Sequence, residues 1–450
     1  SPFGVILSQK LDSGRTMKFA QYYNGLGLKI QTQTADVSVA GVQKNIVIDT
    51  QYDTLGRAVK ETVPYLYNAG AIAFQPQTFS QAVTVSTYDI LGRVKSVTPP
   101  NGNATSTNYG ELSVSQTDAK GITTISTMDV WGQVVSVQPS VGPQLSYTYD
   151  PLGRLKKVTK GTAAPDKTET EIYYDFAGRK TSMLDPDMGT WSYGYDARGN
   201  LKAQTDARNC VSNLSYDALG RLTQKNFTGS GECANTPAIS YYYDGQGFSF
   251  LGTSYGGGSN VLGRRTGMID GSGATLWSYD VRGRVTQQNK FIFSDPTKSA
   301  AETFSTSWTY NSADLPVTTT YPDGETLVTN YNSQGMPVGM TNNDAQPFTY
   351  VNSVLYDRFG RITNLALGNS VQRTYTYNAQ NTDRIGGMLQ QILSTGSAAA
   401  TLQNLVYDYD RNANVTSIQD GRNNETSLFA YDNLNRLTSA TVKNAQDQVI

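Results

Sequence analysis

The chain has 450 residues, and its 36 Lys and Arg nearly balance its 37 Asp and Glu, which leaves a net charge of −1. This balance provides no basic surface of the kind that binds nucleic acid, and no apolar run approaches the roughly 18 residues of a membrane-spanning helix. Charged residues make up only 16% of the chain, so uncharged polar residues must supply most of the surface, which suits an exposed extracellular β-sheet.

One pattern, Tyr-Asp-x-x-Gly-Arg, recurs from one end of the chain to the other. Such recurrence indicates a repeat architecture in which each unit packs mainly against its neighbours. The near-complete copies are Tyr52, Asp53, Gly56 and Arg57; Tyr88, Asp89, Gly92 and Arg93; Tyr149, Asp150, Gly153 and Arg154; Tyr174, Asp175, Gly178 and Arg179; Tyr216, Asp217, Gly220 and Arg221; Tyr279, Asp280, Gly283 and Arg284; and Tyr356, Asp357, Gly360 and Arg361. Degenerate copies begin at Tyr23, Met128, Tyr195, Tyr331, Tyr409 and Tyr431.

The spacing of the copies defines the repeating unit. Successive Tyr residues are often 21 positions apart, as from Tyr174 to Tyr195 and from Tyr195 to Tyr216. This length fits two strands of about six residues and two short turns. The predicted fold class is therefore all-β: a continuous array of antiparallel hairpins whose twist and bulges curve it into a hollow shell.

Each residue of the pattern has a role in a hairpin turn. Asp217 suits the first position of a type I turn, and Gly220 suits the left-handed position that forms a G1 bulge. Tyr216 and Arg221 should lie on the two neighbouring strands, where the guanidinium can stack on the ring. We call a turn of this kind a tip turn.

A second kind of turn should close the other end of each hairpin, and we call it a base turn. Its residues are turn formers rich in Asp, Asn, Pro and Gly. Examples are Pro100-Asn101-Gly102, Asp118 to Gly121, Asp185 to Gly189, Pro322-Asp323-Gly324 and Asp420-Gly421. Strand, tip turn, strand and base turn then repeat along the chain.

These quoted units resemble the YD-repeat family, also called RHS repeats, over about residues 17 to 441. The resemblance implies a long β-sheet that spirals into a shell. In bacterial relatives, such as insecticidal toxin complexes and polymorphic toxins, the shell encloses a toxic C-terminal domain, whereas animal teneurins use a related shell in adhesion. The stretches from Tyr22 to Thr34 and from Tyr52 to Tyr65 are most similar to the B component of bacterial toxin complexes.

We expect residues 1–450 to form a single shell segment of a longer polypeptide. An irregular Gly-rich insertion at about residues 226–273 lacks the Lys-Ser/Thr and the helix of a phosphate-binding loop. The excursion from Tyr65 to Phe79 is predicted to be a surface loop, and a small helix is predicted within Thr382 to Leu393.

The residues offer little for catalysis, because the chain contains no His. This excludes Ser-His and Cys-His nucleophiles and most zinc sites. Asp is plentiful, but nearly every conspicuous Asp, including those before Pro151, Pro186 and Pro296, lies at a turn position that explains it. We therefore expect no enzyme activity, no cofactor and no metal, with a carboxylate glycosidase and calcium-binding turns as weaker alternatives.

Cys210 and Cys233 are the only cysteines. They flank the Tyr216 to Arg221 hairpin, and the resemblance implies export to oxidising surroundings, so we predict that they form a disulfide. Closing a loop of this size would contribute about 3 kcal/mol by the chain-entropy argument. Two unpaired thiols remain the alternative, since sequence gives no distance between them.

The resemblance and the missing catalytic residues predict a secreted or cell-surface container for a C-terminal effector of the same polypeptide or complex. Other toxin-complex subunits would then be its partners. The alternative is an adhesin, because exposed Tyr and Trp side chains can stack on sugar rings. The chain has 29 Tyr, and its Trp residues are Trp131, Trp191, Trp277 and Trp308. That function would need an outward-facing aromatic patch that binds a glycan.

Overall fold

The computed structural model describes residues 2–39, 42–68, 72–344 and 346–450. Within these ranges, 36 antiparallel strands form one sheet, and β22 and β23 form a separate two-stranded sheet. Two three-residue 3₁₀ segments are the helical elements assigned there. The predicted all-β array of hairpins is confirmed. Among the described residues no helix is long and apolar enough to cross a membrane.

The strands fall into two groups, which we call the first winding (β1–β26) and the second winding (β27–β38). The first begins with β1 Phe3–Lys10, β2 Thr16–Tyr23, β3 Lys29–Val39, β4 Val42–Tyr52, β5 Ala58–Thr62, β6 Tyr65–Asn68, β7 Val83–Tyr88, β8 Val94–Thr98, β9 Thr105–Tyr109, β10 Ser113–Thr117, β11 Thr123–Met128, β12 Val134–Pro139 and β13 Leu145–Tyr149. It continues with β14 Leu155–Lys160, β15 Thr168–Tyr174, β16 Lys180–Asp185, β17 Gly189–Tyr195, β18 Leu201–Thr205, β19 Val211–Tyr216, β20 Leu222–Thr228, η1 Gly231–Cys233, β21 Ile239–Tyr243, β22 Phe248–Phe250, β23 Thr253–Tyr255, β24 Arg265–Asp270, β25 Gly273–Tyr279 and β26 Val285–Phe293. The second consists of β27 Ala301–Tyr310, β28 Pro316–Thr320, β29 Thr326–Tyr331, β30 Pro337–Asn342, β31 Thr349–Tyr356, β32 Ile362–Leu367, β33 Gln372–Tyr377, β34 Leu389–Thr395, η2 Ser397–Ala399, β35 Thr401–Tyr409, β36 Val415–Asp420, β37 Glu425–Tyr431 and β38 Leu437–Lys443.

Most strands pair with the next strand in sequence, so the sheet grows hairpin by hairpin. The pairing slips by one residue at each complete tip turn: Ser215 pairs with Gln224, but Tyr216 pairs with Leu222. Such a bulge increases the local twist of the strands. Repetition of the slip at nearly every tip turn curves the whole sheet in one direction.

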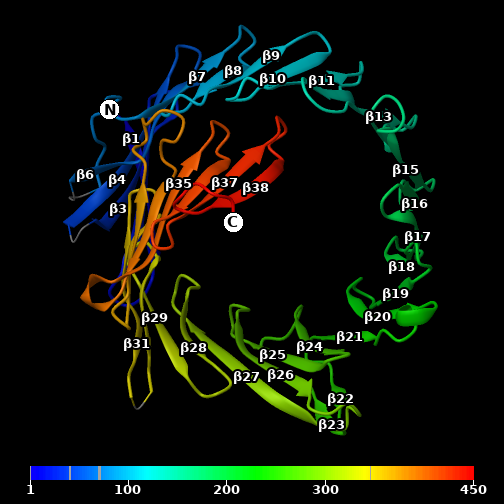
Figure 1. Cartoon of the computed structure of the whole chain (residues 1–450). Helices are drawn as coiled ribbons and strands as arrows, with labels where there is room; N and C mark the ends of the chain where they lie inside the picture. Colours follow the sequence, from blue (N-terminus) through cyan, green and yellow to red (C-terminus); the bar gives the residue numbers. More distant parts are fainter. Residues whose placement is uncertain (1, 40–41, 69–71, 345) are drawn as a thin grey trace.

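The curvature carries the sheet around a ring (Figure 1). The first winding runs from blue through cyan to green, and the second, from yellow to red, returns to the side of the first strands. Where the windings touch, hydrogen bonds join residues that are 281 to 316 positions apart in sequence. We call this line of contact the seam.

The wall has little core. One buried cluster joins Ala20, Tyr22 and Ile30, and Phe74 packs against it. A second lies where the small β22–β23 hairpin covers the main sheet, and it contains Phe248 and Ala274. Elsewhere most strand residues are half-buried, as expected for a single curved layer.

Two local predictions are wrong. The stretch from Tyr65 to Phe79 is not only a surface loop, because β6 pairs with β4 and Phe74 packs edge-on against Tyr22. The stretch from Tyr65 to Phe79 covers apolar and amide side chains near the start of the chain. No helix forms within residues 382–393, because the pairing of Tyr377 with Leu389 makes this stretch an enlarged tip turn followed by β34. Strand pairing overrides local helix propensity there.

Residues 226–273 include β21 to β24, and the irregular part is the β22–β23 hairpin inserted between the paired strands β21 and β24. Loops around this hairpin carry the Gly-rich sequence. The insertion therefore interrupts the regular spacing of units without interrupting the sheet.

Candidate functional site

The recurring tip turn is the most distinctive chemical feature of the chain, and the turn between β19 and β20 shows its geometry. The Gly220 N–H donates to the Asp217 carbonyl at 3.1 Å, and the Asp217 N–H donates to the Arg221 carbonyl at 3.0 Å. Gly220 has φ of 77°, a conformation that costs other residues roughly 1 kcal/mol or more. The predicted type I turn with a G1 bulge is present.

The aspartate carboxylate organises this turn. Asp217 Oδ1 accepts hydrogen bonds from the N–H groups of Leu219 and Arg221, each at 2.9 Å. Its Oδ2 accepts from the Arg221 Nε at 2.7 Å. In the equivalent turn, the Arg154 guanidinium and then the Arg154 N–H hold the pKa of Asp150 below its ordinary value. The carboxylate is therefore occupied with fixing the turn.

The arginine stacks on a tyrosine of the following unit, and the prediction that it stacks within its own hairpin is wrong. Arg154 lies 4.8 Å from the centre of the Tyr174 ring, and Arg221 lies 4.4 Å from that of Tyr243. Each strand has two neighbours, and the arginine turns toward the one outside its hairpin. The other pairs are Arg57 with Tyr88, Arg93 with Tyr109, Arg179 with Tyr195, Arg284 with Tyr310, and Arg361 with Tyr377.

The same tyrosine also bonds back to the preceding unit. The Tyr174 hydroxyl donates to the Leu155 carbonyl at 2.9 Å, and Tyr216 donates to the Leu201 carbonyl at 2.9 Å. Burial raises the pKa of Tyr216. The Arg154 Nη1 also donates to the Asp175 carbonyl of the next tip turn at 3.0 Å. Arginine and tyrosine together therefore fasten each unit to the next.

At the seam, base turns of the first winding meet tip turns of the second. The Ser312 N–H donates to the Leu11 carbonyl at 3.0 Å, and Arg15 donates to the Tyr331 carbonyl. Further along, the Arg384 N–H donates to the Asn101 carbonyl at 3.1 Å. Backbone groups that a hairpin leaves unpaired at its ends are thus satisfied by the other winding.

Side chains extend the seam toward the end of the chain. Lys120 Nζ lies 3.1 Å from Asp410 Oδ2, and Asn412 Nδ2 donates to Asp118 Oδ2 at 2.6 Å. A Cβ built on Gly142 would lie 2.9 Å from Leu434 Cδ1, so a residue without a side chain lets these turns approach. The sequence analysis missed these seam residues, because no pattern connects positions nearly 300 residues apart.

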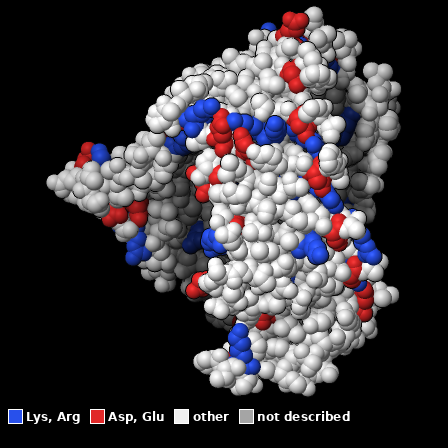
Figure 2. Space-filling view, turned by 90° about the vertical axis from the view of Figure 1, so that its right-hand side faces the viewer, with Lys and Arg blue, Asp and Glu red and all other residues white. Residues whose placement is uncertain are grey.

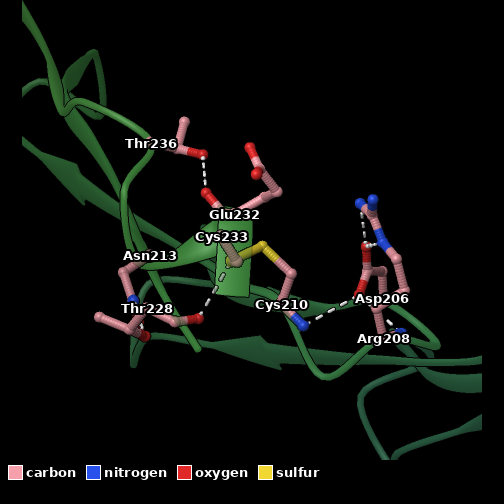
Figure 3. Close-up of a disulfide and its surroundings, with 8 residues drawn as sticks. All are labelled: Asp206, Arg208, Cys210, Asn213, Thr228, Glu232, Cys233 and Thr236. Atoms are coloured by element: carbon pink, nitrogen blue, oxygen red, sulfur yellow. Dashed lines mark hydrogen bonds and ion pairs between the residues drawn. A yellow bond between two sulfur atoms is a disulfide. The ribbon is translucent and has the colours of Figure 1, made fainter. Parts of the chain in front are cut away.

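The structure joins Cys210 and Cys233 in a disulfide, the pairing that the sequence predicts, with a Cα separation of 5.6 Å. The bond connects the base turn after β18 to the η1 segment after β20 (Figure 3). The Cys210 N–H donates to Asp206 Oδ1 at 2.9 Å. The disulfide therefore links two adjacent base turns of the first winding.

Little in the described ranges suggests a catalytic or ligand site. No group of three His, Cys, Asp or Glu side chains there could hold a metal ion. On the face that Figure 2 shows, Lys and Arg lie next to Asp and Glu along a narrow band, and most of the surface is uncharged. Trp131 is exposed, whereas Trp191, Trp277 and Trp308 are half-buried. The tryptophans do not all face outward as an aromatic glycan-binding patch would require.

Comparisons with known proteins agree with this architecture. The Teneurin YD-shell family matches residues 144–285, and a domain of unknown function, DUF6443, matches residues 6–113. The crystal structure of TcdB2-TccC3-Cdc42 is similar with a TM-score of 0.80 and 17% identity over 97% of this chain and 24% of that chain. The structure of the Photorhabdus luminescens Tc holotoxin pore is similar with a TM-score of 0.78 and 16% identity, over the same shares. No curated protein sequence matches significantly.

The repeated tip turn and the match of the Teneurin YD-shell family to residues 144–285 support the predicted resemblance to YD-repeat proteins. The chain shares its fold with the toxin-complex structures. It spans 24% of the length of the toxin-complex chains that it matches.

Proposed function

We propose that this chain is a wall segment of a secreted bacterial container that encloses a C-terminal toxin or effector of the same polypeptide or complex and delivers it. The observation that carries the proposal is the seam. A sheet that only curved would leave a gap between windings, whereas here base turns and tip turns close that gap with hydrogen bonds and an ion pair. The chain itself performs no catalysis.

The wall would act by keeping proteases and chaperones away from the enclosed effector. Its backbone groups are paired from strand to strand, and the arginine and tyrosine of each unit hold neighbouring units together. Most strands of such a wall are paired on both sides, which leaves proteases and chaperones little unpaired edge along its length. The aspartates of the tip turns support a structural role, because their carboxylates are held by backbone N–H groups and arginine.

Other toxin-complex subunits are the proposed partners, since the similar structures contain TcdB2 together with TccC3. These structures share the fold of this chain over 97% of its length. An adhesin that binds glycans is the alternative, and it would use exposed aromatic side chains such as Trp131. A glycan array that binds the wild-type chain and loses binding with Trp131→Ala would favour it.

The test uses the full-length polypeptide with its downstream region and limited proteolysis. A protected C-terminal fragment is expected from the wild type. The double variant Lys120→Glu and Asn412→Asp places like charges opposite Asp410 and Asp118, so the seam should open and the fragment should be cut faster. Lys202→Glu with Gln446→Asp, at exposed positions, makes the same charge change and should leave protection intact. Immediate degradation of the downstream region in the wild type would contradict the proposal.

A further inference from the structure

A segment between β6 and β7 crosses β2, β3 and β4 without joining the sheet as a strand. Residues 72–78, which we call the strap, are extended and form no strand. The sheet continues without them, because β5 pairs directly with β7, with Lys60 opposite Val85. The Val63 N–H donates to the Ala82 carbonyl at 2.8 Å and closes the base of the insertion. The strap can therefore leave its position without breaking the pairing of β5 with β7.

The strap lies on the outer face of the wall. Tyr22 and Tyr242 each precede the tyrosine of a tip turn, so both point to the face opposite to that tyrosine. Tyr242 stacks on Phe248 of the β22–β23 hairpin with ring centres 4.5 Å apart, and Figure 1 shows this hairpin outside the ring. Phe74 of the strap packs against Tyr22. The strap therefore covers the face that points away from the lumen.

Amide side chains hold the strap by its backbone. The Gln31 Nε2 donates to the Gln75 carbonyl at 3.1 Å, and the Gln31 Oε1 accepts from the Gln75 N–H at 3.0 Å. The Gln33 Nε2 donates to the Ala73 carbonyl at 2.8 Å. A side-chain amide pairs in this way with a peptide group as a neighbouring strand would. These bonds do not depend on the side chains of the strap, so another extended segment can form them.

A buried carboxylate fixes the orientation of these amides. Asp49 is 0% exposed, and it accepts from the Gln31 Nε2 at 2.6 Å and from the Tyr65 hydroxyl at 2.7 Å. An ionised carboxylate accepts hydrogen bonds and donates none, so the Gln31 oxygen must face the strap and the Gln33 Nε2, which lies 2.7 Å from it. The Thr78 N–H of the strap donates to Asp49 at 3.1 Å. The outer face of β2–β4 is thus preorganised for an extended backbone.

The strap fits this face incompletely. The Gln33 Oε1 and the Tyr22 hydroxyl are buried and have no hydrogen-bond partner among the described residues, and these residues are only 2% and 6% exposed. A buried polar atom without a partner is costly. Ile72 and Phe74, the apolar anchors of the strap, are half-buried, whereas Phe248 of the β22–β23 hairpin is 8% exposed. Another segment can therefore make contacts that the strap leaves unmade.

We propose that the outer face of β2–β4 binds an extended polypeptide segment of a partner protein, and that the strap is its built-in occupant, which the partner displaces. The strap indicates the chemistry of that segment: apolar side chains two positions apart, as at Ile72 and Phe74, and an unblocked peptide group next to them, as at Gln75. A segment that also brings a donor to the Gln33 Oε1 binds more tightly than the strap. This site does not depend on an enclosed effector, because it faces away from the lumen.

The experiment measures, by fluorescence anisotropy, how a labelled synthetic peptide of residues 72–79 binds to the purified chain. The variant Ile72→Ser with Phe74→Ser weakens the strap and leaves the face beneath it intact. It should bind the peptide at least tenfold more tightly than the wild type, because a closed occupant lowers the apparent affinity by the fraction of open molecules. Thr78→Pro removes the N–H that bonds to Asp49 and should also tighten binding.

The controls separate the site from general stickiness. Leu251→Ser with Ile125→Ser removes two exposed apolar side chains elsewhere and should bind like the wild type. Gln33→Ala, added to the strap variant, should weaken binding about fivefold through the lost amide. A peptide with Ser in place of its Ile and of the Phe at position 74 should not bind. Far-ultraviolet circular dichroism checks that each variant keeps the sheet.

Three results would overturn the proposal: equal binding to the wild type and to both strap variants, binding that Gln33→Ala leaves unchanged, or no binding to any variant. Sedimentation velocity adds a fourth. Wild-type dimers that dissociate when the peptide is added would identify the strap of a second copy as the occupant, in place of a separate partner.

Discussion

The tip turns of the first winding and those of the second form the same turn in different surroundings. Six of the seven near-complete copies of the motif lie in the first winding, where the turns project into solvent. In the second, Asn311 and Asn332 replace Asp, and Ala413 and Asn435 occupy the left-handed position of Gly with φ of 65° and 60°. Near-complete copies are thus concentrated in the winding whose tip turns have no support beyond their own unit and its neighbours, and the copy from Tyr356 to Arg361 is the exception.

This difference indicates which interactions stabilise the tip turns of each winding. A tip turn of the second winding also forms hydrogen bonds with base turns across the seam, so a less complete motif suffices there. Tyr331 and Tyr409 are only 8% exposed, whereas Tyr174 and Tyr216 are half-buried. Packing between the windings thus provides part of the stability that the complete motif provides to a tip turn of the first winding.

Base turns also differ in what stabilises them. Removal of the disulfide that joins two of them has the largest predicted effect on the free energy of unfolding. Base turns near Leu11 and Asn101 are held by the seam, whereas those at Cys210 and Cys233 are held by their disulfide. Removing it with Cys210→Ser and Cys233→Ser should lower the free energy of unfolding by about 3 kcal/mol. Urea unfolding measures the change, and alkylation of both cysteines in the unreduced wild type would contradict the pairing.

Tyr174→Ala should have the next largest effect on the free energy of unfolding. It removes a half-buried ring under Arg154 and the bond to the Leu155 carbonyl, at a cost of about 2 kcal/mol. Tyr173→Ala is the matched control, because its ring is 46% exposed and its hydroxyl bonds to Glu171 on the same strand. Thermal unfolding should separate the two variants; equal losses would show that the tyrosine does not fasten neighbouring units.

The sequence predicted the tip turn because its determinants are local. The conformation of Gly220 and the bonds of Asp217 depend on residues within four positions. The stacking partner of Arg221 was mispredicted, since the pattern does not say which neighbouring strand its side chain faces. The seam could not be predicted at all, because Lys120 meets Asp410 only after the curvature of many bulges has accumulated.

Opposite substitutions at the left-handed position should sharpen the comparison of the windings. Gly220→Ala should cost about 1 kcal/mol through its backbone conformation, since a Cβ there would meet no heavy atom closer than 3.8 Å. Ala413→Gly should stabilise the second winding by about the same amount. Paired urea titrations measure both changes. A loss of stability with Ala413→Gly would show that its side chain contributes packing at the seam.

The smallest predicted effect is that of acid, which should distinguish a tip turn built on Asp in the first winding from one built on Asn in the second. Hydrogen bonds from Arg154 and its N–H lower the pKa of Asp150 below the ordinary 3.8. A lowered folded-state pKa gives stability that is present above the unfolded pKa and lost as pH falls through the folded value. Hydrogen exchange at residues 150–154, corrected for the intrinsic effect of pH, should therefore rise below about pH 4. The turn at Asn332, whose amide does not titrate, should show no such rise, and equal responses would place the acid-sensitive group outside the tip turns.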